Sequence, residues 1–396
     1  MQKETTEISA KKLTISIAPG SYKGTIISQM AAGCMETAVR RVFPNAYVNV
    51  IPLADGGEGT LEIIQQHCGG EMNTSIVLNA YGRRVRARWL KVRDCAIIQT
   101  SEAIGLSMLK SSERDPIQSS SFGVGELIQK AIYSDFKRIM VCMGDSATTD
   151  VGIGMLSALG ARFFNNKGER LEPTVLSMSK LAHINIDHFN KRIKETEFIG
   201  LADTSNSLCG NEGHVSVYGE QKGLKSRDLQ MLSQNFDRIG SVMEDQFGAP
   251  IRNTPYTSPS GGIAAAIKAV LRGRIIPTLD YLDSLISFRE SLMNSSVVIT
   301  GEGRLDRSSK YGKVPYVVAN STKGLCLLIL GGYTQEGQDD FREFDHVELF
   351  CLPLQGVNYL DVDMCKVITD TTQFALGMLS EKKKITFLKT KDDISA

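Results

Sequence analysis

Residues 13–43, LTISIAPGSYKGTIISQMAAGCMETAVRRVF, decide the fold class of this chain. The segment opens with a short apolar run, LTISIAP, and continues through a loop of small residues, GSYKGT. Apolar residues at helical spacing then follow to residue 43. An apolar run, a glycine-containing loop and a helical pattern in this order predict a βα unit.

The same rhythm recurs along the chain. Further short runs rich in Ile, Val and Leu lie at 46–53, 95–100, 138–144, 197–203, 296–302, 325–332 and 346–352. We interpret them as continuous apolar strands that are buried on both faces, as in a parallel sheet. A second clear helical pattern lies at 125–136. The sequence therefore predicts an α/β fold with crossover helices.

The length of 396 residues predicts two domains, because one hydrophobic core rarely grows to that size. Residues 70–100 interrupt the βα rhythm and read as a β-meander around a Gly-Arg-Arg turn. The βα style returns after about residue 280. We expect a discontinuous α/β domain at 1–78 and 281–396, with an inserted mixed α/β domain at 79–280.

Composition limits the classes of partner. With 45 basic and 44 acidic residues the formal charge is +1, which predicts neither nucleic acid nor an anionic membrane as a partner. The polar start and the lack of an apolar stretch of about 20 residues predict a cytoplasmic protein. Eight cysteines without a CxxC pair are expected to be reduced thiols. Five histidines without ligand spacing predict no zinc site, and His214 is expected to pack.

Small and acidic residues fall repeatedly just past the carboxyl ends of apolar strands. Ligands bind at that edge of a parallel sheet. One such loop alone would read as a helix cap or a turn, and none matches a P-loop or a Rossmann fingerprint. The glycines in two of them leave backbone N–H groups open to an anion. Together the loops predict a site; they lie at 19–24, 54–60, 144–150, 202–206 and 300–306.

Longer blocks carry a family resemblance. In order and spacing, the chain resembles type I glycerate kinases at APGSYKGT (18–25), PLADGGEGTLE (52–62), ERDPIQSSSFGVGELI (113–128), GDSATTDVGIGML (144–156), SVYGEQKG (216–223), SGGIAAAI (260–267) and TGEGRLDRSSKYGKVP (300–315). The resemblance implies a flavodoxin-like domain built from both chain ends, an inserted second domain and an active cleft between them. It also implies phosphorylation of D-glycerate with ATP and Mg²⁺, generally at the 2-hydroxyl. The choice between 2- and 3-phosphoglycerate, and between a monomer and a homodimer, stays open.

Phosphoryl transfer needs cations, a carboxylate-held Mg²⁺ and a base or orienting group at the attacking hydroxyl. We expect Asp203 to be the base because it ends an apolar strand and precedes Ser205 and Asn206; an N-cap or Asx turn is the alternative. The catalytic candidates are Asp203, Asp150, Lys23 and Arg304. The metal candidates are Asp55 and Asp306. Substrate or nucleotide contacts are expected from Ser21, Asp55, Gly56, Gly57, Glu58, Gly59, Ser146, Thr148, Asn206, Lys222, Gly301, Glu302 and Lys313.

Several loop residues depart from the pattern of that family. Gly20 stands where the family has an aspartate, and Asp145 stands where it has a glycine before the serine. A carboxylate at 145 would repel a phosphate. Two alternatives follow: a kinase for a related sugar acid, or a weakened paralogue that binds a metabolite without turnover. The other departures are Gln99, Phe122, Val124, Thr149, Val151 and Ser207.

Overall fold

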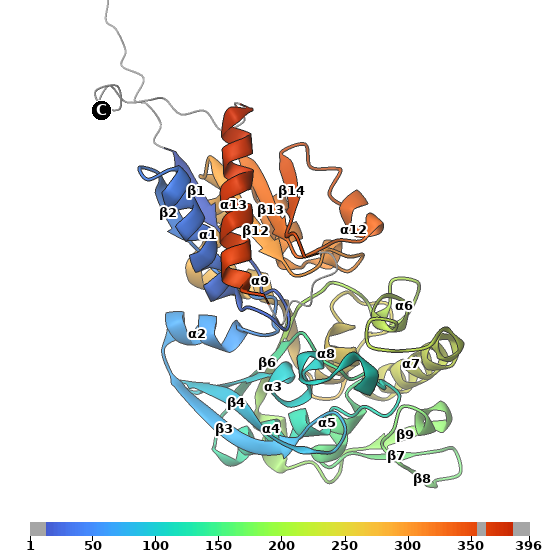
Figure 1. Ribbon diagram of the computed structural model, residues 1–396. Coiled ribbons are helices and arrows are strands. Elements are labelled where there is room, and N and C mark those ends of the chain that lie inside the picture. The colour runs from blue at the N-terminus through green and yellow to red at the C-terminus, as the bar shows by residue number, and fades with distance from the viewer. Residues whose placement is uncertain (1–12, 355–361, 383–396) are drawn as a thin grey trace, which may run out of the picture.

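The computed structural model describes residues 13–354 and 362–382. The described chain forms two layered parts that meet along one side (Figure 1). The first and last elements of the chain build one part, and the middle of the chain builds the other. A third, three-stranded sheet lies at the far end of the second part.

The first part is built on a five-stranded parallel sheet. Its order is β14 (Val347–Cys351), β13 (Leu325–Leu330), β12 (Val297–Glu302), β1 (Thr14–Ile17) and β2 (Tyr47–Val50). Counted in chain order within this sheet, the strands run 2-1-3-4-5, which is a doubly wound order. The segments that were far apart in the sequence, β1 and β12, are therefore direct neighbours.

Helices cover both faces of this sheet. Alternate residues of β12 point to opposite sides: Val297 and Ile299 join the cluster under α1 (Ser28–Val42) and α13 (Met364–Glu381), and Val298 joins the opposite cluster. The opposite cluster includes side chains of α2 (Thr60–Cys68), α9 (Thr278–Ile286), α10 (Phe288–Met293) and α11 (Val314–Asn320), and it continues into the neighbouring sheet, which α2 and α9 contact. The short helix α12 (Gln335–Asp339) lies between β13 and β14 in the chain.

The second part is built on a six-stranded mixed sheet. Its order is β11 (Arg274–Pro277), β10 (Glu197–Ala202), β6 (Arg138–Met143), β5 (Cys95–Gln99), β4 (Arg84–Val92) and β3 (Glu71–Leu78). The strands from β11 to β5 are parallel, and β4 and β3 are antiparallel. The small third sheet consists of β8 (Arg170–Leu171), β7 (Arg162–Phe164) and β9 (His183–Asn185).

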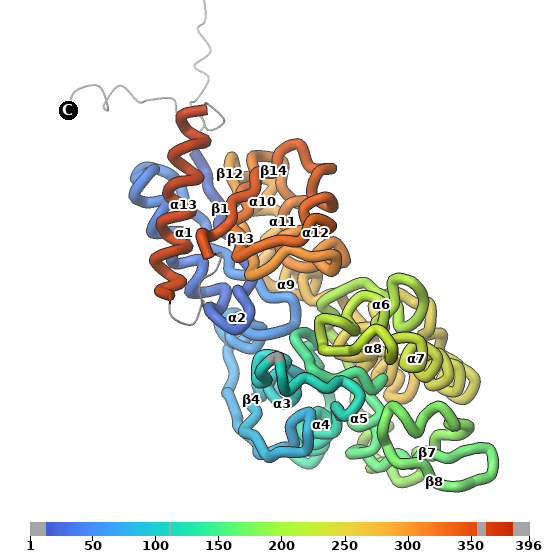
Figure 2. Tube along the Cα trace, turned by 45° about the vertical axis from the view of Figure 1, so that its right-hand side comes forward, coloured from blue at the N-terminus to red at the C-terminus, as the bar shows by residue number. Residues whose placement is uncertain are grey.

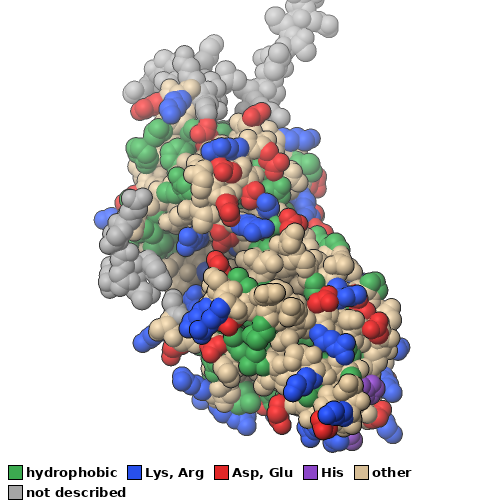
Figure 3. Space-filling model, turned by 90° about the vertical axis from the view of Figure 1, so that its right-hand side faces the viewer, with side chains coloured by type: hydrophobic (Ala, Val, Ile, Leu, Met, Phe, Trp, Pro, Cys, Tyr) green, Lys and Arg blue, Asp and Glu red, His purple; other side chains and the backbone are tan. Residues whose placement is uncertain are grey.

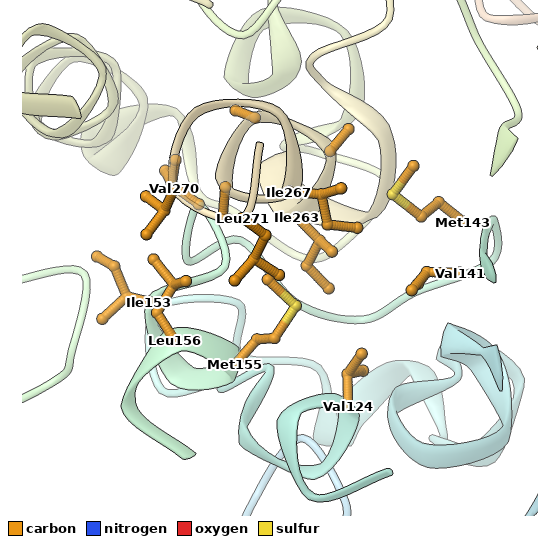
Figure 4. Packing of buried hydrophobic residues seen from close by; sticks show 14 of the residues in the cluster. Val124, Val141, Met143, Ile153, Met155, Leu156, Ile263, Ile267, Val270 and Leu271 are labelled. Carbon is orange, nitrogen blue, oxygen red and sulfur yellow. The ribbon is translucent and has the colours of Figure 1, made fainter. Parts of the chain in front are cut away.

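The core of this second part lies between the sheet and its helices. Figure 4 shows Met155 and Leu156 of α5 facing Ile263 and Ile267 of α8, with Val141 of β6 close by. Close packing of such side chains holds the strand ends and the loops after them in place. The helices of this part are α3 (Thr100–Ile104), α4 (Phe122–Tyr133), α5 (Ile153–Ala158), α6 (His214–Tyr218), α7 (Ser226–Phe247) and α8 (Pro259–Ala269).

The predicted elements can be compared with these bounds. All eight predicted strands are present, and the meander at 70–100 is confirmed as β3, β4 and β5. The helical patterns at 26–43 and 125–136 appear as α1 and α4, and α4 begins earlier, at Phe122. Burial on both faces is wrong for β2 and β14, which are partly exposed because each lies at an edge of its sheet.

The domain limits at 78 and 280 stay a prediction. Sheet membership favours a first limit just before Glu71, because β3 pairs with β4 in the six-stranded sheet. The predicted limit at 78 leaves β3 in the first domain, although the predicted meander that contains β3 begins at residue 70.

On the face shown in Figure 3, Lys and Arg side chains are interspersed with Asp and Glu side chains. No helix among the described residues combines the length and apolar character that crossing a membrane requires.

One expectation about the cysteines is wrong. Cys34 of α1 and Cys365 of α13 form a disulfide, with Cα atoms 5.5 Å apart. The two helices run side by side in both views (Figure 1 and Figure 2). The pair is 331 positions apart, so nothing in local sequence could reveal it. The other cysteines are free, and Cys142 and Cys326 are buried as small core residues, as expected.

A thiol count checks this disulfide. Protein denatured without a reductant is expected to react with Ellman's reagent at six cysteines, the number that remains free. Prior reduction is expected to add the two thiols of Cys34 and Cys365. Eight reactive thiols in the unreduced sample would contradict the pairing.

Candidate active site

The loops after the strand ends surround a small cavity where the two parts of the molecule meet. Its volume is about 40 Å³, and its walls come from both parts. Lys23 follows β1 and Lys313 precedes α11, whereas Asp145, Asp203 and Lys222 come from the second part. We call this space the first cavity. Its polar lining and small size suit a small polar ligand.

A larger space of about 370 Å³, the second cavity, lies on the side of the five-stranded sheet. Its walls combine charged groups with the apolar side chains of Leu354 and Met364. Lys23, Lys313 and Gln221 line both cavities. The second cavity also takes in Ser21, Tyr22, Thr25, Glu302, Gly303, Arg304, Asp306 and Gly331.

Lys23 stands at the junction of the cavities. Its Nζ lies 3.8 Å from Oδ1 of Asp145. Desolvation acts to lower the pKa of Lys23, but the negative charges of Asp145, Asp55, Asp203 and Glu302 outweigh it and raise the pKa. Lys23 therefore stays protonated across the pH range in which enzymes work.

Lys222 is buried in the wall of the first cavity. Its Nζ donates to the carbonyl of Thr148 at 2.7 Å and to Oγ of Ser146 at 3.3 Å. Among the described residues no carboxylate forms an ion pair with it, and burial lowers its pKa to about 8. A buried ammonium group held only by neutral oxygens is well suited to receive an anionic ligand.

The acceptor for Lys222 depends on a close backbone approach. Gly261 has φ +71°, and a Cβ at this position would lie 2.2 Å from the carbonyl oxygen of Thr148. Only glycine fits there. The SGG sequence at 260–262 thus lets α8 press the loop after β6 against Lys222.

Lys313 is the third cation. Its side chain is 8% exposed, and its Nζ lies 3.6 Å from Oδ1 of Asp306. Asp306 also accepts hydrogen bonds from the backbone N–H and the hydroxyl of Ser308. Burial acts to raise the pKa of Asp306, but Lys313 and Ser308 hold it below its usual range. Asp306 is therefore a charged carboxylate in the second cavity.

Two carboxyl groups of the site titrate near neutrality. Asp203 directly follows β10, and burial, with repulsion from Asp55, raises its pKa to about 7. Glu302 ends β12; burial raises its pKa to about 7, although the Ser309 hydroxyl donates to it at 2.8 Å. A general base works best when its pKa is close to the operating pH, so Asp203 has the right acidity and lies in the small cavity.

The remaining carboxylates lie nearby. Asp55 and Glu58 line a narrow space with Gly20, Lys23 and Glu302. Burial raises the pKa of Glu58, and Asp145 adds to the shift. Among the described residues there is no group of three or more Asp, Glu, His or Cys side chains that could hold a metal ion without other ligands.

Several predicted residues do not reach the cavities described above. Asn206 is buried and uses its amide within the protein: its Nδ2 donates to Glu212, and its Oδ1 accepts from Tyr218 at 2.7 Å. Thr148 takes part through its backbone carbonyl. The backbone positions Gly56, Gly57, Gly59 and Gly301 shape turns and the strand end but do not line the two main cavities.

The hydrogen bonds of the Asp150 side chain indicate a structural role. Its carboxylate is buried and accepts hydrogen bonds from the backbone N–H groups of Ser121, Gly152 and Gly154, and from the Ser121 hydroxyl. It lines neither cavity. The side chain therefore joins the start of α4 to the turn before α5.

The change Asp150→Asn tests this environment. The NH₂ group of the new Asn side chain cannot accept hydrogen bonds from the backbone N–H groups that now donate to the carboxylate. We therefore expect a loss of about 1–3 kcal/mol in the free energy of unfolding. Urea denaturation measures it, with the exposed Asp345→Asn as the control. A fall in kcat with unchanged stability would instead indicate a catalytic role for Asp150.

The residues that depart from the family pattern differ in their conformation and in their place relative to the cavities. Asp145 and Val151 have φ of +51° and +54°, the left-handed region that glycine adopts without strain. Asp145 also lines the first cavity beside Lys23. Gly20 borders the narrow space near Asp55, whereas Gln99, Phe122, Val124, Thr149 and Ser207 line none of these cavities.

Sequence reasoning missed several lining residues. Ser258, Pro259 and Ser260 enter the first cavity from the start of α8, and Tyr218 and His214 enter from α6. The blocks SVYGEQKG and SGGIAAAI marked these segments without indicating which side chains face the ligand. The expected packing of His214 is confirmed, since its ring stacks on Phe236.

Comparisons with known proteins show which family this chain resembles. Residues 15–363 match the model of the glycerate kinase family. Glycerate kinase from Halalkalibacterium halodurans is 32% identical over 337 residues, which cover 84% of this chain and 88% of that protein. Glycerate 2-kinase from Escherichia coli K12 is 33% identical over 321 residues, 81% of this chain and 84% of that protein.

A solved structure has a similar fold. The crystal structure provisionally described as glycerate kinase 2 from Salmonella typhimurium LT2 superposes with a TM-score of 0.69 at 28% identity. The superposition covers 94% of this chain and all of that one. The family match extends over both sheets and all the loops around the two cavities. This chain belongs to the glycerate kinase family.

Proposed function

We propose that this chain transfers the γ-phosphoryl group of ATP to D-glycerate and releases phosphoglycerate and ADP. One observation carries the proposal: Lys23 and Lys313 line both the small polar cavity and the larger cavity. A phosphoryl group that passes between a nucleotide and an acid must cross such a junction, where two cations can stabilise its charge.

The first cavity would hold the acid. We place the carboxylate of D-glycerate against Lys222, whose ammonium group has only neutral oxygen partners within hydrogen-bond distance. The 2-hydroxyl would then face Asp203, which would accept its proton as the oxygen attacks phosphorus. Assignment to the 2-hydroxyl follows the name of the Escherichia coli relative, glycerate 2-kinase.

The second cavity would hold the nucleotide. Arg304 and Lys313 supply positive charge for its phosphates, and Leu354 and Met364 supply apolar surface. Mg²⁺ is usually held by one or two carboxylates together with substrate phosphates. The charged carboxylate Asp306 fits that role, and Asp55 is the second candidate. The ion would neutralise charge on the phosphates when bound.

The order of the strands favours a specific division of the chain into domains. The sheet order 2-1-3-4-5 supports a flavodoxin-like domain made from both chain ends, and the six-stranded sheet supports an inserted domain. Both cavities would then lie in the cleft between these domains.

A coupled assay tests the function. Purified protein with ATP and Mg²⁺ is expected to release ADP only when D-glycerate is present, and phosphorus NMR identifies the phosphoglycerate formed. No ADP release across neutral pH, with Mg²⁺ or Mn²⁺, would reject the proposal. Calorimetry on the same preparation separates the alternatives: binding without turnover indicates the weakened paralogue, and faster turnover of another sugar acid indicates a different substrate.

The titration of Lys222 predicts a pH dependence. Its pKa is lowered to about 8, so its positive charge is present below that pH and is lost as pH rises through it. We expect the KM for D-glycerate to rise about tenfold between pH 7 and pH 9, because only about a tenth of the free enzyme then carries the charge. The KM for ATP is the internal control. A KM for D-glycerate that stays flat to pH 9 would place the carboxylate elsewhere.

A further inference from the structure

His214 forms part of the wall of the first cavity. Its ring lies between Phe236 of α7 and Tyr218 of α6, with both centroid distances 5.5 Å and interplanar angles of 6° and 29°. The two rings fix the plane of the imidazole. Within that plane, each ring nitrogen has one direction in which it can form a hydrogen bond.

The two nitrogens of His214 have different surroundings. Nδ1 lies 3.1 Å from the hydroxyl oxygen of Ser258. Nε2 is fully buried and has no hydrogen-bond partner among the described residues. The residue as a whole is 2% exposed. A buried polar atom without a partner costs free energy, and an apolar side chain could serve the packing alone. His214 lines the first cavity, so a ligand held there would supply the missing partner of this nitrogen.

The charge state narrows the kind of group that His214 can bind. Burial holds the pKa of its imidazole well below the usual range, and the positive charge of Lys222 adds to the effect. A neutral imidazole donates from one nitrogen and accepts at the other. It suits an uncharged hydroxyl group, while the nearby ammonium of Lys222 suits the carboxylate.

We propose that His214 is a specificity-determining residue whose Nε2 forms a hydrogen bond with the 3-hydroxyl of D-glycerate. The inference rests on the proposed function for the identity of the acid. Lys222 takes the carboxylate and Asp203 takes the reacting 2-hydroxyl, so the 3-hydroxyl is the polar group of the acid that still lacks a partner. His214 makes the site select acids that carry this group.

D-lactate provides the test, because it has the same configuration as D-glycerate and lacks only the 3-hydroxyl. Calorimetry with ADP and Mg²⁺ present measures the binding of both acids without phosphoryl transfer. The wild-type chain is expected to prefer D-glycerate. His214→Ala and His214→Leu are expected to reduce that preference by about 2- to 12-fold, the worth of one hydrogen bond. Leu keeps the space between the rings filled if Ala disturbs folding.

Phe163→Leu is the matched control, because Phe163 is a buried ring in the same core that lines neither cavity and does not stack on His214. It is expected to keep the preference for D-glycerate. The inference is overturned if both His214 variants keep the preference, if Phe163→Leu loses it equally, or if the wild-type chain does not prefer D-glycerate. Loss of preference without any ADP release from ATP would reject the proposed function and support His214. Normal ADP release with an unchanged preference in the His214 variants would support the proposed function and reject the role of His214.

Discussion

Replacing Asp203 by Asn is expected to lower kcat by about 10²–10⁴-fold with little change in the KM for D-glycerate. Asn keeps the shape of the side chain but cannot accept the proton of the attacking hydroxyl. Asp203 lines the first cavity, and burial raises its pKa to about 7. The base must be deprotonated, so the kcat/KM of the wild-type enzyme is also expected to fall as pH drops below about 7.

Steady-state kinetics at pH 6 to 9 on Asp203→Asn measure both effects. Asp187→Asn, an exposed aspartate in the second part, is the control and is expected to match the wild type. If Asp203 only stabilises a turn, Asn would replace it well, because Asn caps a helix about as well as Asp. A kcat within about threefold of the wild type would exclude the role of base.

Lys313→Met is expected to lower kcat by about 10²–10³-fold, the usual cost of removing one group that stabilises transition-state charge. Lys313 is buried and lines both cavities, so its charge lies where the transferring group would pass. Met keeps most of the side-chain volume. The KM for ATP is also expected to rise, because Asp306 loses the cation 3.6 Å from its carboxylate.

Lys310→Met is a close control, since Lys310 lies three positions earlier and pairs with Asp340 outside both cavities. It is expected to retain the kcat and the KM for ATP of the wild type. Equal losses in the two variants would show that the effect comes from the structure of the turn before α11 rather than from the charge of Lys313.

The fold was largely predictable because its signals are local. An apolar run followed by a glycine loop identifies a strand and the loop at its carboxyl end, and parallel pairing then brings such loops to one edge. Lys23 and Asp203 were found in this way. The strands β7 to β9 were missed because they have only two or three residues each, too few for a period to be read.

The site was less predictable because burial and contacts depend on the whole fold. Asp150 has the same sequence context as a catalytic aspartate, yet its oxygens are occupied by backbone N–H groups around α4 and α5. The expectation that Asp145 repels a phosphate stays a prediction, and the structure adds that Lys23 Nζ lies 3.8 Å from its carboxylate, a contact that the sequence could not show. His214 showed no motif, since its neighbours Phe236 and Ser258 lie far along the chain.

The position of β1 in its sheet has a consequence for synthesis of the protein on the ribosome. β1 lies between β2 and β12, and the hydroxyl of Thr300 donates to the carbonyl of Ala18, 282 positions earlier. At roughly 5–20 residues per second, translation reaches β12 about 15–60 s after β1. During that interval one edge of the nascent β1–β2 pair stays open, and the six-stranded sheet can fold first. A chaperone that binds apolar strands is expected to protect the emerging amino-terminal segment until the last quarter of the chain arrives.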